Sequence, residues 1–276
     1  MSERRSDGEA GLESGDGDDA GTGGGDGAKP ELEIPADLLA GHPTTAYFWG
    51  HVAGSGDVSA GNHAVRSDAP RERRSREQLE VTTTDEKSAQ VLAVIAGGDV
   101  ERDTTSREYA HDASITRTED EYTLVIDGND DGDNGLFGRT STLGLPVDSR
   151  GTYRFGAFSS HDRELLRGLL EGCGTICFKS SSDTVGISFV HDDRQLLEVV
   201  RELIDDCPVD APTGDLAETS SGGYWFGIDD AAAPAFGTWL YENCEETGLF
   251  APSRRRKLER SLEQADAYDW SDERLE

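Results

Sequence analysis

Lysine, methionine, cysteine and aromatic residues are all scarce in this chain of 276 residues. It has four Lys, one Met and four Cys, and aromatic residues make up 7% of the sequence. The cysteines at 173, 177, 207 and 244 are too few for a dense disulfide framework, so we expect free thiols and a cytoplasmic protein. No apolar run approaches the roughly 20 residues that span a bilayer, and the N-terminal region has no hydrophobic signal core. We therefore expect no membrane association.

Carboxylates dominate the composition. The sequence has 56 Asp and Glu against 26 Lys and Arg, which gives a formal net charge of −30. Because several segments also show apolar periodicity, we interpret the chain as a folded, salt-adapted (halophilic) protein with an acidified surface. At molar salt the Debye length is about 3 Å, so repulsion of a nucleic acid is screened, but the counterion-release gain from Lys and Arg is lost as well. The charge therefore weakens a nucleic-acid-binding hypothesis without excluding it.

Composition divides the chain into a tail and two units. Residues 1–30 have almost no apolar content, and we expect a disordered acidic tail there. The first unit is predicted over 31–134, where it ends in an acidic linker, and the second unit over 135–276. Thr44 and Ser160 are the predicted N-caps of the first helix of each unit.

The same order of elements is predicted in both units: helix, strand, strand, helix, then further strands. In the first unit we predict helices at 44–53 and 85–96, a polar loop at 59–77, and strands at 78–84, 107–116 and 121–127. In the second unit we predict helices at 160–171, 192–206, 231–244 and 253–268, and strands at 174–179, 184–190 and 223–228. Such an internal repeat constrains the whole fold.

The first helices of the two units end in the same glycine pattern. One reads FWGHVAGSG over 48–56 and the other LRGLLEGCG over 166–174. In each, two glycines lie one helical turn apart, which lets two helix backbones approach closely, and a third glycine is predicted to end the helix. We predict that the two helices pack against each other through four glycines: Gly50, Gly54, Gly168 and Gly172.

This paired motif resembles the LAGLIDADG family, in which two such helices pack at the centre of a pseudo-symmetric domain. The resemblance covers roughly 44–127 and 155–268, and in the second unit LLRGLLEGCGTI, TVGISFVHDDRQLLEVVREL and the late GYWFGIDD segment fall in the family's order. It implies an α/β fold of the α+β kind, with two αββαββα repeats and mixed or antiparallel sheets. It also implies a monomer, because the two repeats supply both halves of the pseudo-dimer.

Two further resemblances concern parts of the chain. The second motif is similar to the non-catalytic LAGLIDADG domain of WhiA-type bacterial regulators, although the sequence shows no convincing helix-turn-helix. The segment FWGHVAGSGDV is similar to haloarchaeal proteins encoded among cobalamin-synthesis genes. No residue indicates a corrin site, so we expect no cofactor.

The resemblance places Ser55 and Cys173 at the positions that carry chemistry in nuclease members of the family. There, an acid precedes the last glycine of each motif, and the two acids share divalent metals that position the attacking water. Neither a hydroxyl nor a thiol is the hard oxygen ligand that Mg²⁺ requires. Glu171 and Asp57 each lie two positions away and point elsewhere around the helix end. The resemblance therefore predicts a protein with no catalytic residues.

Other side chains with metal-binding chemistry have a simpler interpretation. Cys173 and Cys177, with His161 or His191, are of the type that binds zinc or cobalt. Because free cysteine is often buried, we favour small core residues and predict no metal site. His51 is predicted to pack beside the helix pair.

Two basic clusters are candidates for contact with a polyanion. One opens the last predicted helix, and the other lies in the loop between the first two strands, which line the nucleic-acid saddle in the LAGLIDADG family. For the run at 254–257, intramolecular ion pairs are an equal alternative. The candidates are Arg71, Arg73, Arg74, Arg76, Arg254, Arg255, Arg256 and Lys257.

Together these patterns predict a non-catalytic LAGLIDADG-like protein that binds DNA or RNA or has a regulatory role. One alternative is an accessory protein of a metabolic operon, linked to cobalamin biosynthesis, that acts through a protein partner. The other is a degenerate homing endonuclease.

Overall fold

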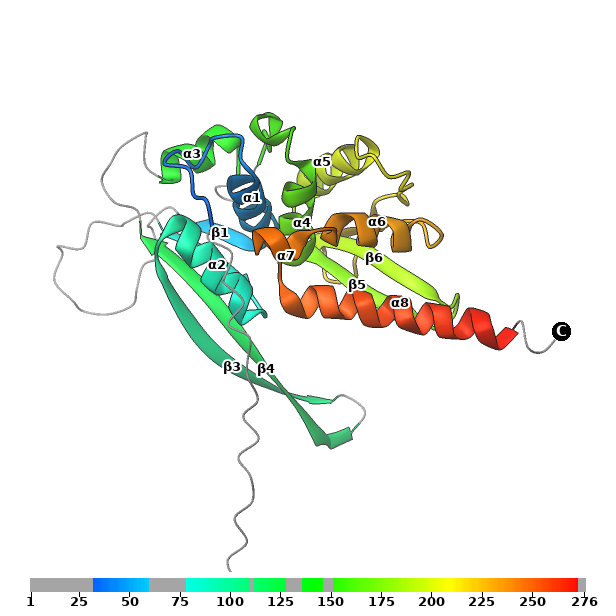
Figure 1. Cartoon of the computed structure of the whole chain (residues 1–276). Coiled ribbons are helices and arrows are strands. Elements are labelled where there is room, and N and C mark those ends of the chain that lie inside the picture. The colour runs from blue at the N-terminus through cyan, green and yellow to red at the C-terminus, as the bar shows by residue number, and fades with distance from the viewer. Residues whose placement is uncertain (1–31, 60–77, 110–111, 128–135, 146–150, 273–276) are drawn as a thin grey trace, which may run out of the picture.

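Two helices, α1 (Pro43–Ser55) and α4 (Asp162–Cys173), lie side by side at the centre of the molecule with one sheet on either side (Figure 1). The structure is a computed structural model that describes residues 32–59, 78–109, 112–127, 136–145 and 151–272. The predicted acidic tail, the linker before 135 and four of the candidate arginines (Arg71, Arg73, Arg74 and Arg76) lie outside the described residues.

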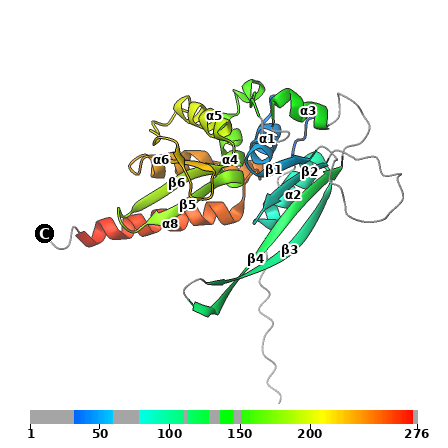
Figure 2. The ribbon, with the colours of Figure 1, turned by 180° about the vertical axis from the view of Figure 1, so that it is seen from behind.

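The first half of the chain has the order αββαββα. After α1 come β1 (Gly56–Ser59), β2 (Gln78–Thr83), α2 (Glu86–Ala96), β3 (Asp99–Tyr109), β4 (Asp112–Asp127) and α3 (Leu136–Leu143). The long hairpin of β3 and β4 extends away from the body of the molecule, as Figure 2 shows from behind.

The second half has the same order with two helices added. After α4 come β5 (Gly174–Lys179), β6 (Thr184–His191), α5 (Arg194–Asp205), β7 (Ala217–Glu218), β8 (Tyr224–Gly227), α6 (Ala233–Tyr241), α7 (Cys244–Thr247) and α8 (Pro252–Asp272). A short 3₁₀ turn, η2 (Gly156–Phe158), precedes α4.

Each half forms one antiparallel four-stranded sheet with the same connectivity. The strand order is β1-β2-β4-β3 in the first sheet and β5-β6-β8-β7 in the second. Both orders place the two hairpins of a half in the same relation to its leading helix. The predicted class, two pseudo-symmetric αββαββα repeats, is confirmed.

The leading helices begin differently from the prediction. Thr44 lies inside α1, and the N-cap is His42, whose Nδ1 accepts a hydrogen bond from the backbone N–H of Thr44 at 3.3 Å. Pro43 occupies the first turn, where its fixed φ suits a helix start. Likewise Ser160 precedes the cap of α4, which is His161. The predicted N-cap therefore lies two positions after the observed one in α1 and one position before it in α4.

Two other elements differ from the prediction. The helix expected over 231–244 is divided into α6 and α7, because Asn243 adopts a left-handed conformation with φ 55°. The strand expected from 107 begins at Asp99, since its residues continue the ladder with β4 despite their polarity. The helix α3 was not predicted.

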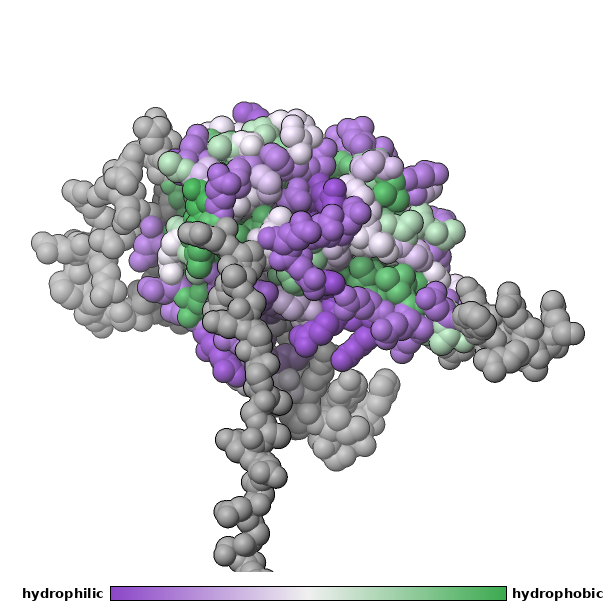
Figure 3. Space-filling model, in the orientation of Figure 1, coloured by the Kyte–Doolittle hydropathy of each residue, from purple (hydrophilic) through white to green (hydrophobic). Residues whose placement is uncertain are grey.

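One face of each sheet is buried under helices and the other is open. In the first sheet Leu79, Val81 and Leu124 point into the core, against α1 and α2, and are fully buried. In the second sheet Ile187 and Phe226 are buried in the core. The helix side is mostly hydrophilic on its outer surface, with small separate hydrophobic patches (Figure 3). None of the helices in the described part of the chain is long and apolar enough to cross a membrane.

Candidate nucleic-acid interface

The contact between α1 and α4 is made backbone against backbone at the motif glycines. A Cβ placed on Gly50 would lie 2.3 Å from the carbonyl oxygen of Leu165, and one on Gly168 would lie 2.2 Å from the carbonyl oxygen of Tyr47. Farther along the pair, Gly54 and Gly172 face each other, with a Cβ on Gly172 3.0 Å from the Cα of Gly54. Real Cβ atoms essentially never approach as closely as at Gly50 and Gly168, and the contact at Gly54 and Gly172 is tighter than most real Cβ contacts, so Gly50 and Gly168 fix the distance between the helices.

The last glycine of each motif is the C-cap of its helix, as predicted. Gly56 and Gly174 have extended backbone conformations, with φ −87° and −100°, so the left-handed turn does not explain them. A Cβ would instead lie 2.4 Å from the Val52 carbonyl oxygen in one case and 2.5 Å from that of Leu170 in the other. The chain can therefore leave each helix directly into the first strand of its sheet.

Ser55 and Cys173 stand at matching ends of the two helices, and both side chains are bound to their own helix. The Ser55 hydroxyl donates to the carbonyl of His51 at 3.1 Å, and the Cys173 thiol donates to the carbonyl of Leu169 at 3.3 Å. Burial raises the pKa of the Cys173 thiol to about 12, although the nearby charge of Arg254 acts in the opposite direction. Two neutral groups therefore occupy the ends of the helix pair.

Arg254 brings positive charge to this centre. It lies close enough to His51 and to Cys173 for its charge to lower the pKa of both. No hydrogen bond or ion pair joins its guanidinium to another residue in the described part of the chain. A metal ion at the helix ends would have to share this region with the charge of Arg254.

A buried polar network crosses the interface between the halves. The Tyr47 hydroxyl on α1 donates to Oε2 of Glu171 on α4 at 2.6 Å. Its oxygen lies 3.1 Å from Oγ of Ser88 on α2, which lies 3.1 Å from Nε2 of His51. With Glu171 ionised, Ser88 donates to Tyr47 and the proton of neutral His51 is on Nε2. Glu171 also accepts the backbone N–H of Ala251 at 2.9 Å.

Asp85 anchors the start of α8 to the first half. One carboxylate oxygen accepts from the backbone N–H of Ser88 at 3.1 Å and caps α2. The other accepts from the backbone N–H of Ser253 at 2.7 Å. Acids of both halves thus bind N–H groups at the beginning of the last helix, where such donors lack partners within the helix.

Burial shifts the titration of two members of this network in opposite directions. Desolvation raises the pKa of Glu171 to about 7, against the hydrogen bonds from Ala251 and Tyr47 that favour its charged form. Desolvation lowers the pKa of His51 to about 4, and the charge of Arg254 adds to this. The Glu171 carboxylate is therefore bound within the interior, and it is not directed towards a metal ion at the helix ends.

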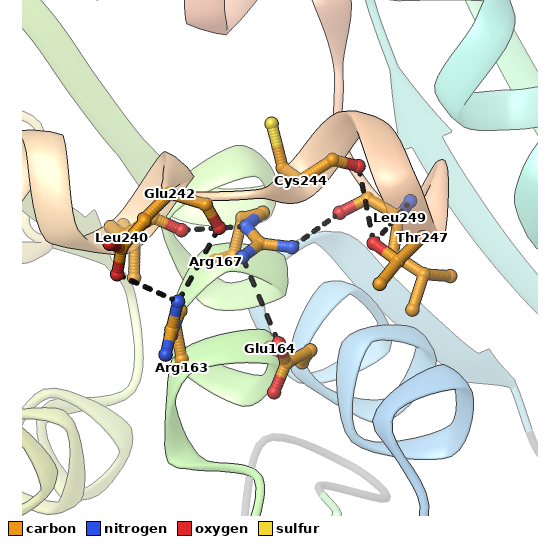
Figure 4. A network of polar contacts seen from close by, with 8 residues as sticks. All are labelled: Arg163, Glu164, Arg167, Leu240, Glu242, Cys244, Thr247 and Leu249. Atoms are coloured by element: carbon orange, nitrogen blue, oxygen red, sulfur yellow. Dashed lines mark hydrogen bonds and ion pairs between the residues drawn. The ribbon is translucent and has the colours of Figure 1, made fainter.

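Arg167, within the second motif, is buried and joins α4 to the loops around α7 (Figure 4). Its Nε donates to the carbonyl of Leu240 at 2.8 Å and a terminal nitrogen donates to that of Leu249 at 2.9 Å. The carboxylate of Glu164 lies 3.8 Å away. This arginine holds the break between α6 and α7 in place and has no exposed surface to offer a ligand.

The run at 254–257 opens α8, and its members have different surroundings. Arg255 forms ion pairs with Glu245 and with Glu259, so intramolecular pairing accounts for it. Arg256 donates from Nε to the carbonyl of Pro252 and lines an open hollow of about 520 Å³ at the start of α2. Lys257 is exposed. Only Arg254 lies at the helix ends.

The side chains considered for a metal do not come together. Cys173 lies at the end of α4, Cys177 lies on β5, and all four cysteines are free. His161 is 3.2 Å from the carbonyl of Gly41, and His191 accepts the backbone N–H of Asp193. Within the described residues, no group of three or more His, Cys, Asp and Glu side chains is arranged to hold a metal ion.

The open face of the first sheet is strongly acidic. Residues paired across antiparallel strands share a face, so the register places Asp57 beside Glu80 and Asp103 beside Glu121 on the side away from the core. Among residues with described side chains, no Lys or Arg lies on this face. Its carboxylates are Asp57, Glu80, Asp99, Glu101, Asp103, Glu119, Glu121 and Asp127.

The open face of the second sheet carries no carboxylate among its described residues. Its register partners are Thr175 with Ser188 and Val190 with Trp225. Val190 and Trp225 are 44% and 43% exposed, which makes them two of the few large apolar residues at the surface. Lys179, also on this face, is paired with Asp230. The two sheets thus present surfaces of different chemistry.

The fold and the paired glycine helices define a LAGLIDADG-type protein. A family model described as "Putative archaeal homing endonuclease" matches residues 26–268, and the chain belongs to this LAGLIDADG family. A comparison with curated proteins found no match.

Several solved structures are similar to this chain at low sequence identity. The meganuclease I-SmaMI bound to uncleavable DNA has a TM-score of 0.49 and 11% identity, over 88% of this chain and 92% of that one. I-GzeII in complex with a DNA target has a TM-score of 0.49 and 12% identity, over 84% and 92%. Full-length WhiA from Thermotoga maritima has a TM-score of 0.41 and 10% identity, over 82% of this chain and 63% of its own.

Sequence reasoning missed Tyr47, Ser88 and the position of Arg254. The sequence contained a signal for Tyr47, because its hydroxyl and the acid Glu171 each stand within a largely apolar stretch of a motif helix. The contact of Ser88 with His51 and the position of Arg254 depend on segments far apart in the chain, and local patterns do not reveal them.

Proposed function

We propose that this protein binds nucleic acid on a LAGLIDADG scaffold without cleaving it. The observation that carries the proposal is the pair Ser55 and Cys173 at the ends of the motif helices, both neutral and both bound to carbonyls of their own helix. Two-metal hydrolysis needs oxygen anions that hold the ions on the attacking and leaving oxygens. The residues present at this centre do not fit divalent metal ions.

Neighbouring acids do not replace the missing ligands. Glu171 is buried and engaged by Tyr47 and Ala251. Asp57 is exposed on the open face, two residues beyond the end of α1, and on the second sheet the matching position is Thr175. A single exposed carboxylate is a poor site for Mg²⁺, which takes several oxygen ligands.

Cleavage and binding are tested separately. Purified protein in molar KCl with Mg²⁺ or Mn²⁺ is expected to leave plasmid and genomic duplexes intact while retarding labelled duplex in a binding assay. Site-specific cutting would overturn the non-catalytic part, and the absence of binding to DNA and RNA at every salt concentration would overturn the binding part.

A gain-of-metal variant tests the role of the two neutral residues. The double change Ser55→Asp and Cys173→Asp is expected to create Mn²⁺ binding measurable by calorimetry. The matched control places the same chemistry away from the centre, as Ser221→Asp and Cys207→Asp, and is expected to bind no metal. Equal Mn²⁺ binding by both variants would contradict the assignment.

A protein-binding accessory role is the second candidate function, favoured by the acidic open face of the first sheet. A surface of one sign attracts a partner of the other sign and repels nucleic acid. Basic proteins captured on immobilised protein in 0.1 M KCl and released in molar KCl would support this role if duplex binding fails. No described residue provides a reason to connect it to a cobalamin.

A further inference from the structure

The two repeats differ most at positions that their symmetry makes equivalent. In each half the residue after the motif is the first on the open face, Asp57 in one and Thr175 in the other. Their register partners are Glu80 and Ser188. A carboxylate pair on the first sheet therefore stands where the second sheet has a hydroxyl pair.

The difference continues across the sheets. One step farther along, Thr82 pairs with Thr123 on the first sheet, and Val190 pairs with Trp225 on the second. The first sheet then adds acids along β3 and β4, including the directly opposed Asp103 and Glu121. In a chain with 56 acidic residues, the strands of the second sheet place no described acid on their open face, and the carboxylate of Asp230 reaches its edge only as the partner of Lys179.

We propose that a duplex contacts this protein through the open face of the second sheet and is excluded from that of the first. This inference rests on the proposed function and makes it more specific. Of two equivalent sheet faces, only that of the second sheet contacts the duplex. Like charges placed face to face are unfavourable in an interface, so the acidic sheet repels phosphate wherever salt does not screen the charges.

The second sheet has groups suited to phosphate and sugar. Hydroxyls such as those of Thr175 and Ser188 are common donors to phosphate oxygens. The indole of Trp225 lies over Gly227, with a ring carbon 3.8 Å from where a Cβ would be, so the ring covers the sheet surface. An aromatic and hydroxyl surface loses less affinity to salt than one built on Lys and Arg, because it releases few counterions.

Exchanging the equivalent pairs tests the asymmetry. Thr175→Asp with Ser188→Glu is expected to weaken duplex binding at least tenfold in 0.1 M KCl, where the Debye length is about 10 Å and the added charges are not screened. The reverse exchange, Asp57→Thr with Glu80→Ser, is expected to leave affinity unchanged or raise it. The charge-matched control for the first variant is Gln195→Glu with Ala235→Glu on the outer side of α5 and α6, both exposed, where no effect is expected.

The outcomes separate the two proposals. If wild-type protein binds no duplex at any salt concentration, both the proposed function and this inference are wrong. If it binds, but the change at Thr175 and Ser188 has the same small effect as its control, only the inference is overturned. Folding of every variant is checked by circular dichroism, and Trp225→Ala, which adds no charge, provides a second variant expected to weaken binding severalfold.

Discussion

Glu171 shows how one residue of a motif can be retained for a structural role. It is the only acid in either nine-residue motif, and it lies in the interior between Tyr47 and the backbone of Ala251. In this position a carboxylate satisfies two donors that would otherwise be buried without partners. Its carboxylate binds the backbone at the start of α8 and does not reach the open face of either sheet.

The pH dependence of folding should report this burial. The unfolded chain releases the Glu171 proton near the ordinary pKa of 4.5, whereas the folded protein holds it until about pH 7. The folded state therefore binds the extra proton, and the contribution is fully present below about pH 4.5 and lost as the pH rises to about 7. His51 acts in the opposite sense, since its contribution is present above pH 6.5 and lost as the pH falls through about 4.

Glu171→Gln isolates the carboxyl group. We expect the free energy of unfolding of this variant, relative to wild type, to increase between pH 4.5 and 7 by up to about 3 kcal/mol, at roughly 1.4 kcal/mol per pKa unit. Urea denaturation in constant molar KCl at four pH values measures the difference. The exposed Glu202→Gln is the matched control for loss of one carboxylate, and a pH-independent difference for Glu171→Gln would contradict the assignment.

At the scale of elements, the helix pair depends on glycine at four positions. A methyl group at Gly168 would lie 2.2 Å from the Tyr47 carbonyl, and backbone cannot yield as a flexible side chain can. We expect Gly168→Ala to lower the free energy of unfolding by at least about 1–3 kcal/mol, the usual cost of overpacking. Thermal and urea denaturation measure it.

Gly156→Ala is the control for this change, because a Cβ there would meet nothing within 4 Å. It is expected to have little effect on stability. Similar losses for the two variants would mean that helix propensity or local backbone effects, and not the helix contact, determine the result.

Most elements could be predicted because their signals are local. The amphipathic α5 and the hairpin of β5 and β6 follow from periodicity and turn residues within a few positions. The caps at His42 and His161 could not, because neither residue type is a strong cap and His42 depends on a specific side-chain orientation. The left-handed Asn243 divides a helix whose sequence is otherwise continuous.

The candidate site was predictable only in part, for a related reason. The motif alone placed Ser55 and Cys173 at equivalent helix ends. The network of Tyr47 and Ser88 brings together side chains from three helices, and the chemistry of the open faces depends on strand register. Neither is encoded in a short stretch of sequence.

At the scale of the whole molecule, the net charge of −30 is concentrated in part on one sheet face. Asp103 lies directly opposite Glu121, an arrangement that costs roughly 0.2–1 kcal/mol in a sheet. We expect Asp103→Asn with Glu121→Gln to stabilise the protein by about that amount in 0.1 M KCl. In molar KCl, where the Debye length is about 3 Å, the difference should disappear.

Thermal unfolding across a KCl series measures this salt dependence. The wild-type midpoint is expected to rise with salt more steeply than that of the neutralised variant. The control is Asp205→Asn with Asp206→Asn at the exposed end of α5, two carboxylates that are not register partners in a sheet. Parallel salt curves for wild type and the Asp103 variant would mean that opposed strand charges do not limit stability.

The attachment of α8 has a consequence for how the protein is made. Asp85 caps α2 in the first half and receives the backbone N–H of Ser253, 168 residues later. The bond from Ala251 to Glu171 spans 80 residues. A nascent chain can therefore form both sheets before its halves are joined, because the junction is completed only after residue 253 has left the ribosome.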